Sequence, residues 1–269
     1  MAPKMASENA PEIRAFWQPG CTSCLRMKEF LQRHGVPFTS VNVLEEKGAM
    51  EELAALGVRT VPIIRRGNEW ANGQVLRDVA RVAGIPYGGT KIHPPAELMR
   101  RLSEIQGAAR RFLGQLPDEK LNNFLPNRPR TYAQLTYHIF NIADAWLEHE
   151  VDGQPLKEGA YNRVPPPEMD TKAKILAYGE DVQRRLDDWW KTRSATTNFQ
   201  DKANVYYGDQ SKHEFFERTT WHSGQHVRQY KLVLETLGIT PDRPLPDSIW
   251  EGLPMPVKVW DDEKPFAAA

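Results

Sequence analysis

The fold of the first part of the chain follows from one stretch, IRAFWQPGCTSC, at residues 13–24. Its first five residues form a short apolar run that ends at Gln18-Pro19-Gly20, which predicts a strand followed by a turn. Residues 22–34 then place apolar side chains at helical spacing and stop at a glycine, which predicts a helix. Cys21 and Cys24 are therefore expected where a strand passes into a helix.

The alternation of strands and helices continues beyond this stretch. The pattern predicts two further strands, at 36–43 and 58–64, and two further helices, at 45–56 and 75–83. An order of strand, helix, strand, helix, strand and helix implies a small α/β layer fold.

The character of the sequence changes near Tyr87-Gly88-Gly89-Thr90, after which strand signals almost vanish. Four amphipathic helices with apolar residues three and four apart predict a helical bundle, at 94–116, 131–146, 172–190 and 212–237. The second helix is expected to start with a capping box at Thr131 and Gln134. The domains we expect are a tail 1–10, an α/β domain 11–87, a linker 88–93, a bundle 94–240 and a proline-rich tail 241–269.

The composition excludes several classes of protein for this chain of 269 residues. Lys and Arg number 35, as do Asp and Glu, so the formal net charge is zero, which argues against nucleic acid or an anionic membrane as the main partner. No apolar stretch approaches the roughly 18 residues of a membrane helix, and the first residues do not read as a secretory signal. We therefore expect a soluble, cytoplasmic protein, and a homodimer is compatible with these features.

The only two cysteines form a Cys-x-x-Cys pair, which in a cytosolic chain indicates redox chemistry or half of a metal site. Cys21 would lie at a helix N-terminus, where free N–H groups favour a thiolate, and Cys24 one turn later could resolve a mixed disulfide. A zinc site would need more ligands than the two cysteines. A pair without redox activity is the alternative.

Together with Thr60-Val61-Pro62 and the turn Gly73-Gln74, this pair makes residues 11–86 resemble glutaredoxins and their thioredoxin-like relatives. The resemblance implies a thioredoxin-like fold in which the Thr-Val-Pro backbone faces the cysteine and holds glutathione or a peptide. It assigns thiol binding to Thr60, Val61, Pro62, Gly73 and Gln74, and catalysis to Cys21 and Cys24. Thr22-Ser23 departs from the usual Pro-Tyr, and the segment 19–24 is also similar to arsenate-reductase-like proteins, which leaves the reductase activity open.

Three histidines of the predicted bundle fall on apolar helix faces. His222 and His226 are four residues apart on the fourth helix, and His138 lies on the apolar stripe of the second. Imidazoles suit zinc, nickel, copper or iron, and three protein ligands leave a position open for water or substrate. The alternative is that they are ordinary histidines of the core.

The segments TYHIFNIADA at 136–145 and TWHSGQHVRQ at 220–229 make residues 94–237 resemble the DinB-like bundle family. This resemblance implies a divalent metal held by His138, His222 and His226. It further implies kinship with transferases and isomerases that use a low-molecular-weight thiol such as mycothiol or bacillithiol, although other members have no known activity.

Two other groups on the bundle helices are expected to stay outside the metal centre. His213 and Glu217 could support the site as neighbours of the ligands or as a general base, but a solvated edge is the simpler interpretation. His149 is expected to be exposed.

Both halves of the chain point to thiol chemistry. We therefore expect a metal-dependent thiol enzyme, a transferase or isomerase that uses glutathione or a related thiol on a small electrophilic or disulfide substrate. The first domain would supply or recycle the thiol. The alternatives are a glutaredoxin-type disulfide oxidoreductase with a non-catalytic bundle and a metal-binding stress or sensor protein.

Overall fold

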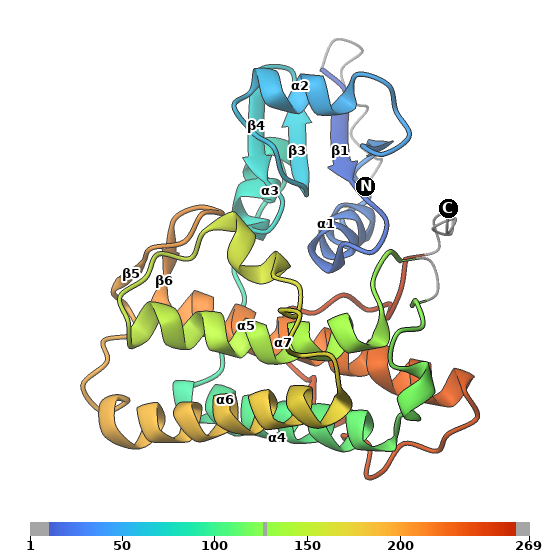
Figure 1. Cartoon of the computed structure of the whole chain (residues 1–269). Coiled ribbons are helices and arrows are strands. Elements are labelled where there is room, and N and C mark those ends of the chain that lie inside the picture. Colours follow the sequence, from blue (N-terminus) through green and yellow to red (C-terminus); the bar gives the residue numbers. More distant parts are fainter. Residues whose placement is uncertain (1–10, 126–127, 262–269) are drawn as a thin grey trace. The chain divides into compact units, whose positions relative to one another are not determined.

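The computed structural model describes residues 11–125 and 128–261 (Figure 1). It divides into two compact units, the first ending at Gly89 and the second beginning at Thr90. The predicted tail 1–10 lies outside the described residues, as does the end of the proline-rich tail from 262 onward. Among the described residues, every helix is too short or too polar to cross a membrane.

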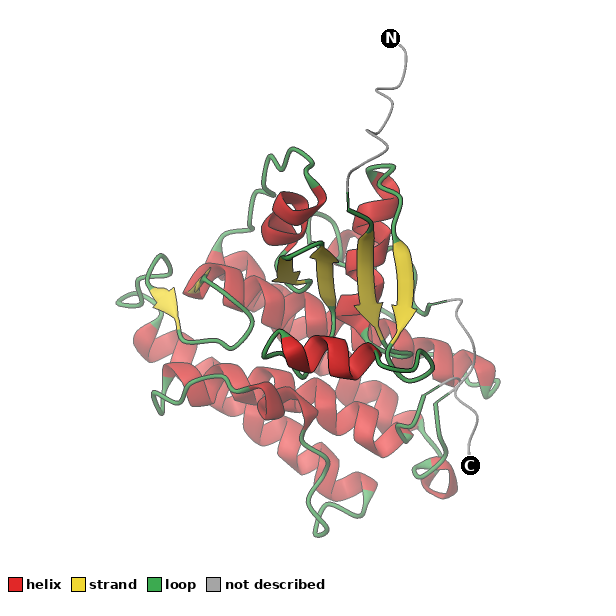
Figure 2. Cartoon of the chain, turned by 90° about the horizontal axis from the view of Figure 1, so that it is seen from above, coloured by secondary structure: helices red, strands yellow, loops and turns green. Residues whose placement is uncertain are grey.

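The first unit is a thioredoxin-like α/β fold, as predicted (Figure 2). Its strands lie in the order β2-β1-β3-β4, with β1 and β2 parallel and the other two pairs antiparallel. The elements of this unit are β1 (Ile13–Trp17), α1 (Thr22–Arg33), β2 (Thr39–Asn42), α2 (Ala49–Ala55), β3 (Ile63–Arg66), β4 (Glu69–Asn72) and α3 (Leu76–Ala83).

Each face of this sheet has its own apolar core, because successive side chains of a strand point to opposite faces. On one face, Ala15 and Ile64 pack with side chains of α1 and α3. On the other face, Phe16 and Ile63 pack with residues of α2. The sheet therefore lies between two helical layers, with α1 and α3 on one side and α2 on the other.

The structure corrects two sequence expectations in this unit. The strand predicted at 58–64 begins only at Ile63, after Pro62, whose ring nitrogen has no hydrogen to donate to a strand ladder. The sequence also missed β4, which forms a hairpin with β3 around Gly67, a glycine with φ of +60°. The sequence of this edge strand, Glu69-Trp70-Ala71-Asn72, gave no strand signal, because only Ala71 of the four residues is buried.

The second unit is built on four long helices that run beside one another (Figure 1). Helix α4 packs on α6 and α7, and α5 packs on the same two helices. Gly179 allows α6 to approach α5 closely, because a Cβ at this position would lie 2.6 Å from the ring of Phe140. The helices are α4 (Pro95–Gln115), α5 (Tyr132–Glu150), α6 (Lys172–Arg193) and α7 (Lys212–Thr236).

Capping boxes fix the starts of the two helices that carry the histidines. The Thr131 side chain accepts a hydrogen bond from the Gln134 amide, and the Gln134 side chain accepts one from Thr131, as the sequence predicted. Ser211 and Glu214 do the same for α7. Before α7 the chain forms a small hairpin that the sequence did not reveal, β5 (Lys202–Ala203) with β6 (Gln210–Ser211).

Short elements and polar contacts complete the second unit. The described residues of this unit include three 3-10 helices, η1 (Asp118–Lys120), η2 (Glu158–Asn162) and η3 (Asp247–Ile249). At the start of α4, hydrogen bonds from Arg100 and then Arg101 lower the pKa of Glu97 to about 2. Arg101 also donates to the carbonyl oxygens of Ile249 and Glu251, at 2.9 and 2.6 Å, and so joins α4 to the C-terminal segment.

Candidate functional site

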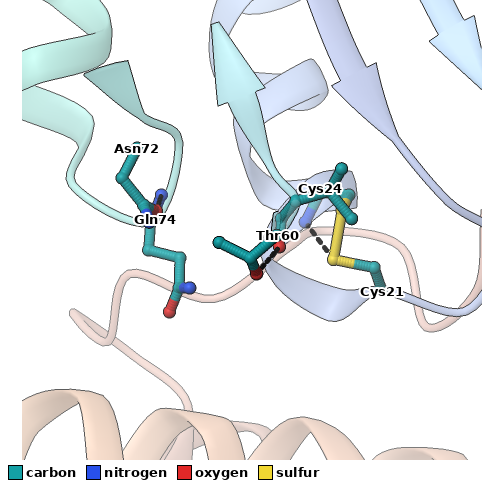
Figure 3. Close-up of a disulfide and its surroundings, with 6 residues drawn as sticks. Cys21, Cys24, Thr60, Asn72 and Gln74 are labelled. Carbon is teal, nitrogen blue, oxygen red and sulfur yellow. Dashed lines mark hydrogen bonds between the residues drawn. A yellow bond between two sulfur atoms is a disulfide. The ribbon is translucent and has the colours of Figure 1, made fainter. Parts of the chain in front are cut away.

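The cysteine pair lies at the start of α1, where β1 ends (Figure 3). Cys21 is the N-cap residue, and its Sγ accepts a hydrogen bond from the Cys24 amide at 3.1 Å. The two cysteines form a disulfide, and Cys24 is buried whereas Cys21 is half-buried. Because the helix N-terminus directs N–H groups at its Sγ, Cys21 is the sulfur whose thiolate form this position favours.

The residues assigned to thiol binding gather around the start of β3 and the end of β4. The Val61–Pro62 peptide bond is cis, and Thr60 lies in the surroundings of the disulfide (Figure 3). The Gly73 amide donates to the Pro62 carbonyl at 2.8 Å, and a Cβ on Gly73 would lie 2.9 Å from the Pro62 Cβ. Only glycine fits this contact without a shift of its neighbours.

The turn that follows Gly73 is tied to the cysteine helix. The Gln74 carbonyl accepts a hydrogen bond from the Arg26 guanidinium of α1 at 3.2 Å, and the Gln74 amide donates to the Asn72 side chain at 3.0 Å. These contacts join the Gly-Gln turn to the helix that carries both cysteines. Sequence reasoning missed Arg26, for which no motif provides a signal.

The three predicted ligand histidines meet inside the bundle. His138 projects from α5, and His222 and His226 project from adjacent turns of α7. The ring of His138 lies 5.4 Å from that of His222 and 4.6 Å from that of His226, between centroids. One ring nitrogen from each histidine lies within 4.8 Å of the others, and all three side chains are buried.

The hydrogen bonding of these histidines leaves nitrogens free to bind a metal. His226 Nδ1 lies 2.7 Å from Gln229 Oε1, so its Nε2 remains buried without a partner. The Nδ1 atoms of His138 and His222 also lack a partner. Buried polar atoms are normally paired, so an unpartnered nitrogen on each of three clustered histidines fits a divalent metal.

Burial sets the protonation state of the centre. It lowers the pKa of His138, His222 and His226 well below the usual histidine range, and nearby positive charge lowers it further. The rings are therefore neutral at pH 7, the form that coordinates metals. Zinc, nickel, iron and copper all accept such imidazole ligands.

One side of the centre is lined by aromatic rings and an arginine that sequence reasoning missed. The Tyr161 ring of η2 lies 5.4 Å from the His222 ring. The Arg218 guanidinium, one turn before His222, lies over the rings of Tyr161 and Tyr207 at 4.7 and 4.6 Å. The four-residue spacing of Arg218 and His222 was the only sequence signal for this arrangement.

Two expectations about neighbouring groups are wrong. Glu217 is buried rather than part of a solvated edge. His149 is half-buried rather than exposed: its Nδ1 lies 2.7 Å from Glu150 Oε1, and its Nε2 accepts the Asn204 amide at 3.0 Å. The partial burial of His149 results from its long-range contact with Asn204 in the loop before α7, which the local sequence does not encode.

His213 and Lys212, at the start of α7, make contacts that stabilise the fold. The Nε2 of His213 lies 2.8 Å from the His93 carbonyl oxygen. Lys212 donates to the Glu150 carboxylate at 3.0 Å and so joins the start of α7 to the end of α5. Neither residue belongs to the three-histidine group.

Comparison with known proteins assigns a family to each unit. The glutaredoxin family model matches residues 13–70, and the DinB superfamily model matches residues 101–230. The first match includes Cys21 and Cys24, and the second includes all three histidines. No curated protein matches the chain. The protein is thus a fusion of a glutaredoxin domain and a domain of the DinB superfamily.

Proposed function

We propose that this protein is a metal-dependent thiol enzyme with an attached thiol–disulfide redox domain. In this proposal the bundle transfers or isomerises a small electrophile through glutathione or a related low-molecular-weight thiol. The observation that carries the proposal is the buried group of His138, His222 and His226, each with a ring nitrogen that lacks a hydrogen-bond partner.

These three side chains would hold a divalent metal ion. When bound, such an ion lowers the pKa of a thiol or water that occupies its open position. Gln229 holds His226 by its Nδ1 and thereby directs the other nitrogen to the centre. The Tyr161 and Tyr207 rings pack on the Arg218 guanidinium and would limit the access of water from that side of the site.

The glutaredoxin domain would reduce disulfides in two balanced steps. The Cys21 thiolate attacks one sulfur of a substrate disulfide, that S–S bond breaks, and the first thiol leaves as a thiolate that takes up a proton. The Cys24 thiolate then attacks the Cys21 sulfur of the mixed disulfide and releases the second thiol. The cysteine pair loses two electrons in total and becomes the disulfide found here, which glutathione would reduce again.

Metal analysis of the purified full-length protein tests the proposal. We expect about one equivalent of a divalent metal, lost when His138, His222 and His226 are changed together to alanine. His34→Ala is the control, because this exposed histidine lies at the end of α1 and outside the group. A triple variant that keeps one full equivalent would contradict the assignment.

A thiol titration of the cobalt-substituted protein then tests the open position. A ligand-field spectrum that changes as glutathione is added supports thiol chemistry at the metal. A spectrum that stays unchanged at saturating thiol supports a metal-binding stress or sensor role instead.

The second candidate is a disulfide oxidoreductase in which the bundle is not catalytic. It is favoured by the position of the Cys21–Cys24 disulfide at a helix N-terminus. The two candidates predict different losses in the full-length chain. Under the leading proposal, the histidine variant loses thiol transfer, and Cys21→Ser lowers it at limiting glutathione. Under the second candidate, only Cys21→Ser removes activity.

A further inference from the structure

Residues 256–260 lie along α7, the helix that carries two of the three histidines, and are here called the C-terminal strap. The Arg228 guanidinium donates to the carbonyl oxygens of Pro256 and Val257, at 2.9 and 2.8 Å. The Gln225 side-chain amide donates to the next two carbonyl oxygens, at 3.0 and 2.9 Å. One turn of α7 thus holds the strap by its main chain.

Gln229 connects the strap with one of the three histidines. Its Nε2 donates to the Val259 carbonyl at 3.1 Å, and its Oε1 lies 2.7 Å from His226 Nδ1. Gln229 is 0 % exposed, so bulk water does not compete for either contact. A single buried side chain therefore joins the C-terminal strap to His226.

The two contacts fix which way round the Gln229 amide lies. A carbonyl oxygen only accepts hydrogen bonds, so the atom of Gln229 beside the Val259 carbonyl is the nitrogen of its NH2 group. The amide oxygen then faces His226, and because this oxygen can only accept, His226 Nδ1 carries the hydrogen. In this neutral tautomer Nε2 has a free lone pair, and Nε2 is the buried nitrogen of His226 that lacks a hydrogen-bond partner.

Loss of the strap removes the contact that holds this orientation. The oxygen and the NH2 group of an amide have nearly the same shape, so without the Val259 carbonyl Gln229 can turn and offer its NH2 group to His226. His226 Nδ1 then accepts, and its hydrogen is transferred to Nε2, where it blocks the lone pair that a metal needs. The strap thus decides between a tautomer that can bind a metal through Nε2 and one that cannot.

We propose that the C-terminal strap is a positioning element of the histidine centre: its docking orients Gln229, and Gln229 holds His226 in the tautomer whose Nε2 binds a metal. The inference rests on the proposed function for the metal, but the choice of tautomer itself requires none. Because coupling between two equilibria is reciprocal, metal binding at Nε2 also favours docking of the strap.

The first test uses the metal-free, full-length protein with isotope-labelled histidine. Long-range proton–nitrogen correlation spectra of the imidazole rings distinguish the two neutral tautomers, and His226→Asn identifies the signals of His226 by their loss. We expect His226 to carry its hydrogen on Nδ1 in the wild-type protein. A wild-type spectrum with the hydrogen on Nε2 would overturn the inference.

Release of the strap tests its role directly. Gln225→Leu combined with Arg228→Leu removes the hydrogen bonds of these two side chains to the strap and leaves Gln229 and the three histidines in place. We expect this released variant to show both tautomers of His226 and to bind zinc about two- to tenfold more weakly, the effect of losing one hydrogen bond. Gln225→Leu alone leaves the contacts of Arg228 and Gln229 with the strap, so it should keep both properties near the wild type.

Arg111→Leu combined with Gln115→Leu is the matched control. These two side chains of α4 also donate to main-chain carbonyl oxygens of the C-terminal segment, but at residues 240–243, outside the strap. We expect this control to bind zinc as the wild type does. If it loses as much zinc affinity as the released variant, the strap has no specific role and the inference is overturned.

Gln229→Glu separates positioning of His226 from general stability. Either oxygen of the new carboxylate accepts a hydrogen bond from His226 Nδ1, so the tautomer no longer depends on the strap. In this background, release of the strap should leave the tautomer and the zinc affinity unchanged. An equal loss of zinc affinity in both backgrounds would overturn the inference, because the double-mutant cycle would then show no coupling between the strap and Gln229.

The outcomes distinguish this inference from the proposed function. If zinc affinity depends on the strap but glutathione leaves the cobalt spectrum unchanged, the proposed function fails and the inference stands. If metal and thiol bind but release of the strap has the same effect in both backgrounds, the inference fails and the proposed function stands. If the protein binds no metal, the proposed function fails, and the tautomer spectra decide whether the strap positions His226.

Discussion

Changing Gln229 to leucine should weaken metal binding without touching a metal ligand. The Gln229 Oε1 lies 2.7 Å from His226 Nδ1, and both side chains are buried, so no water replaces the lost partner. The leucine variant leaves the ring of His226 free to turn and no longer fixes its tautomer. Removing such a partner typically lowers metal affinity about 10- to 100-fold. At 1.4 kcal/mol per tenfold change, this is about 1.4–2.8 kcal/mol of binding free energy.

Gln225→Leu provides the matched control. Gln225 is equally buried on the same helix, and its Nε2 also donates to the Val259 carbonyl, at 2.9 Å. It also contacts Lys258 and Arg228, so its loss removes more hydrogen bonds than that of Gln229. At about 0.5–1.5 kcal/mol per hydrogen bond, Gln225→Leu should destabilise the fold at least as much as Gln229→Leu.

Zinc affinity of both variants can be measured by competition with a chromophoric chelator, and stability by urea unfolding of the metal-free protein. We expect the zinc affinity of Gln229→Leu to fall while that of Gln225→Leu stays near the wild-type value. If both variants lose zinc affinity in proportion to their stability, the contact between Gln229 and His226 has no specific role in metal binding and the reasoning is refuted.

Three further predictions concern the cysteines, the packing and the pH dependence. Cys24→Ser should trap a mixed disulfide with glutathione, seen by intact-protein mass spectrometry, and Cys21→Ser should not; trapping by Cys21→Ser would reverse the two roles. Gly179→Ala should destabilise the fold by about 1–3 kcal/mol in urea unfolding because the new Cβ meets a phenylalanine ring. Gly114→Ala, where nothing lies within 4 Å, should instead stabilise the fold by up to about 1 kcal/mol, and equal effects of the two changes would disprove this account. The hydrogen bonds from Arg100 and Arg101 lower the Glu97 pKa to about 2, so its contribution to stability is complete above pH 4.5 and disappears as the pH falls toward 2. Urea unfolding at several pH values should therefore show the stability gap between wild type and Glu97→Gln narrowing over this range, and a constant gap would rule out the effect.

The sequence alone determined the features that depend on spacing along the chain. The position of Cys21 between a strand and a helix, the four-residue spacing of His222 and His226, and the Thr131 capping box are all local patterns. The regular geometry of strands and helices turns such patterns into predictable positions, because a helix brings every fourth residue to one face. Both family resemblances and the fold class followed from these patterns, and family matches to each unit bear them out.

Only the tertiary structure decided what surrounds these residues. It showed that Gln229 Oε1 is hydrogen-bonded to His226 Nδ1. It also showed that Arg128 lies over the ring of Trp260, which is more than one hundred residues away along the chain. It also showed that His149 is half-buried and accepts a hydrogen bond from the Asn204 amide. Contacts of this kind depend on how loops and the C-terminal segment pack against the helices, and no periodicity in the sequence records them. The histidines could be identified by their spacing, but the C-terminal contacts of Gln229, which also holds His226, arise only when distant segments fold together.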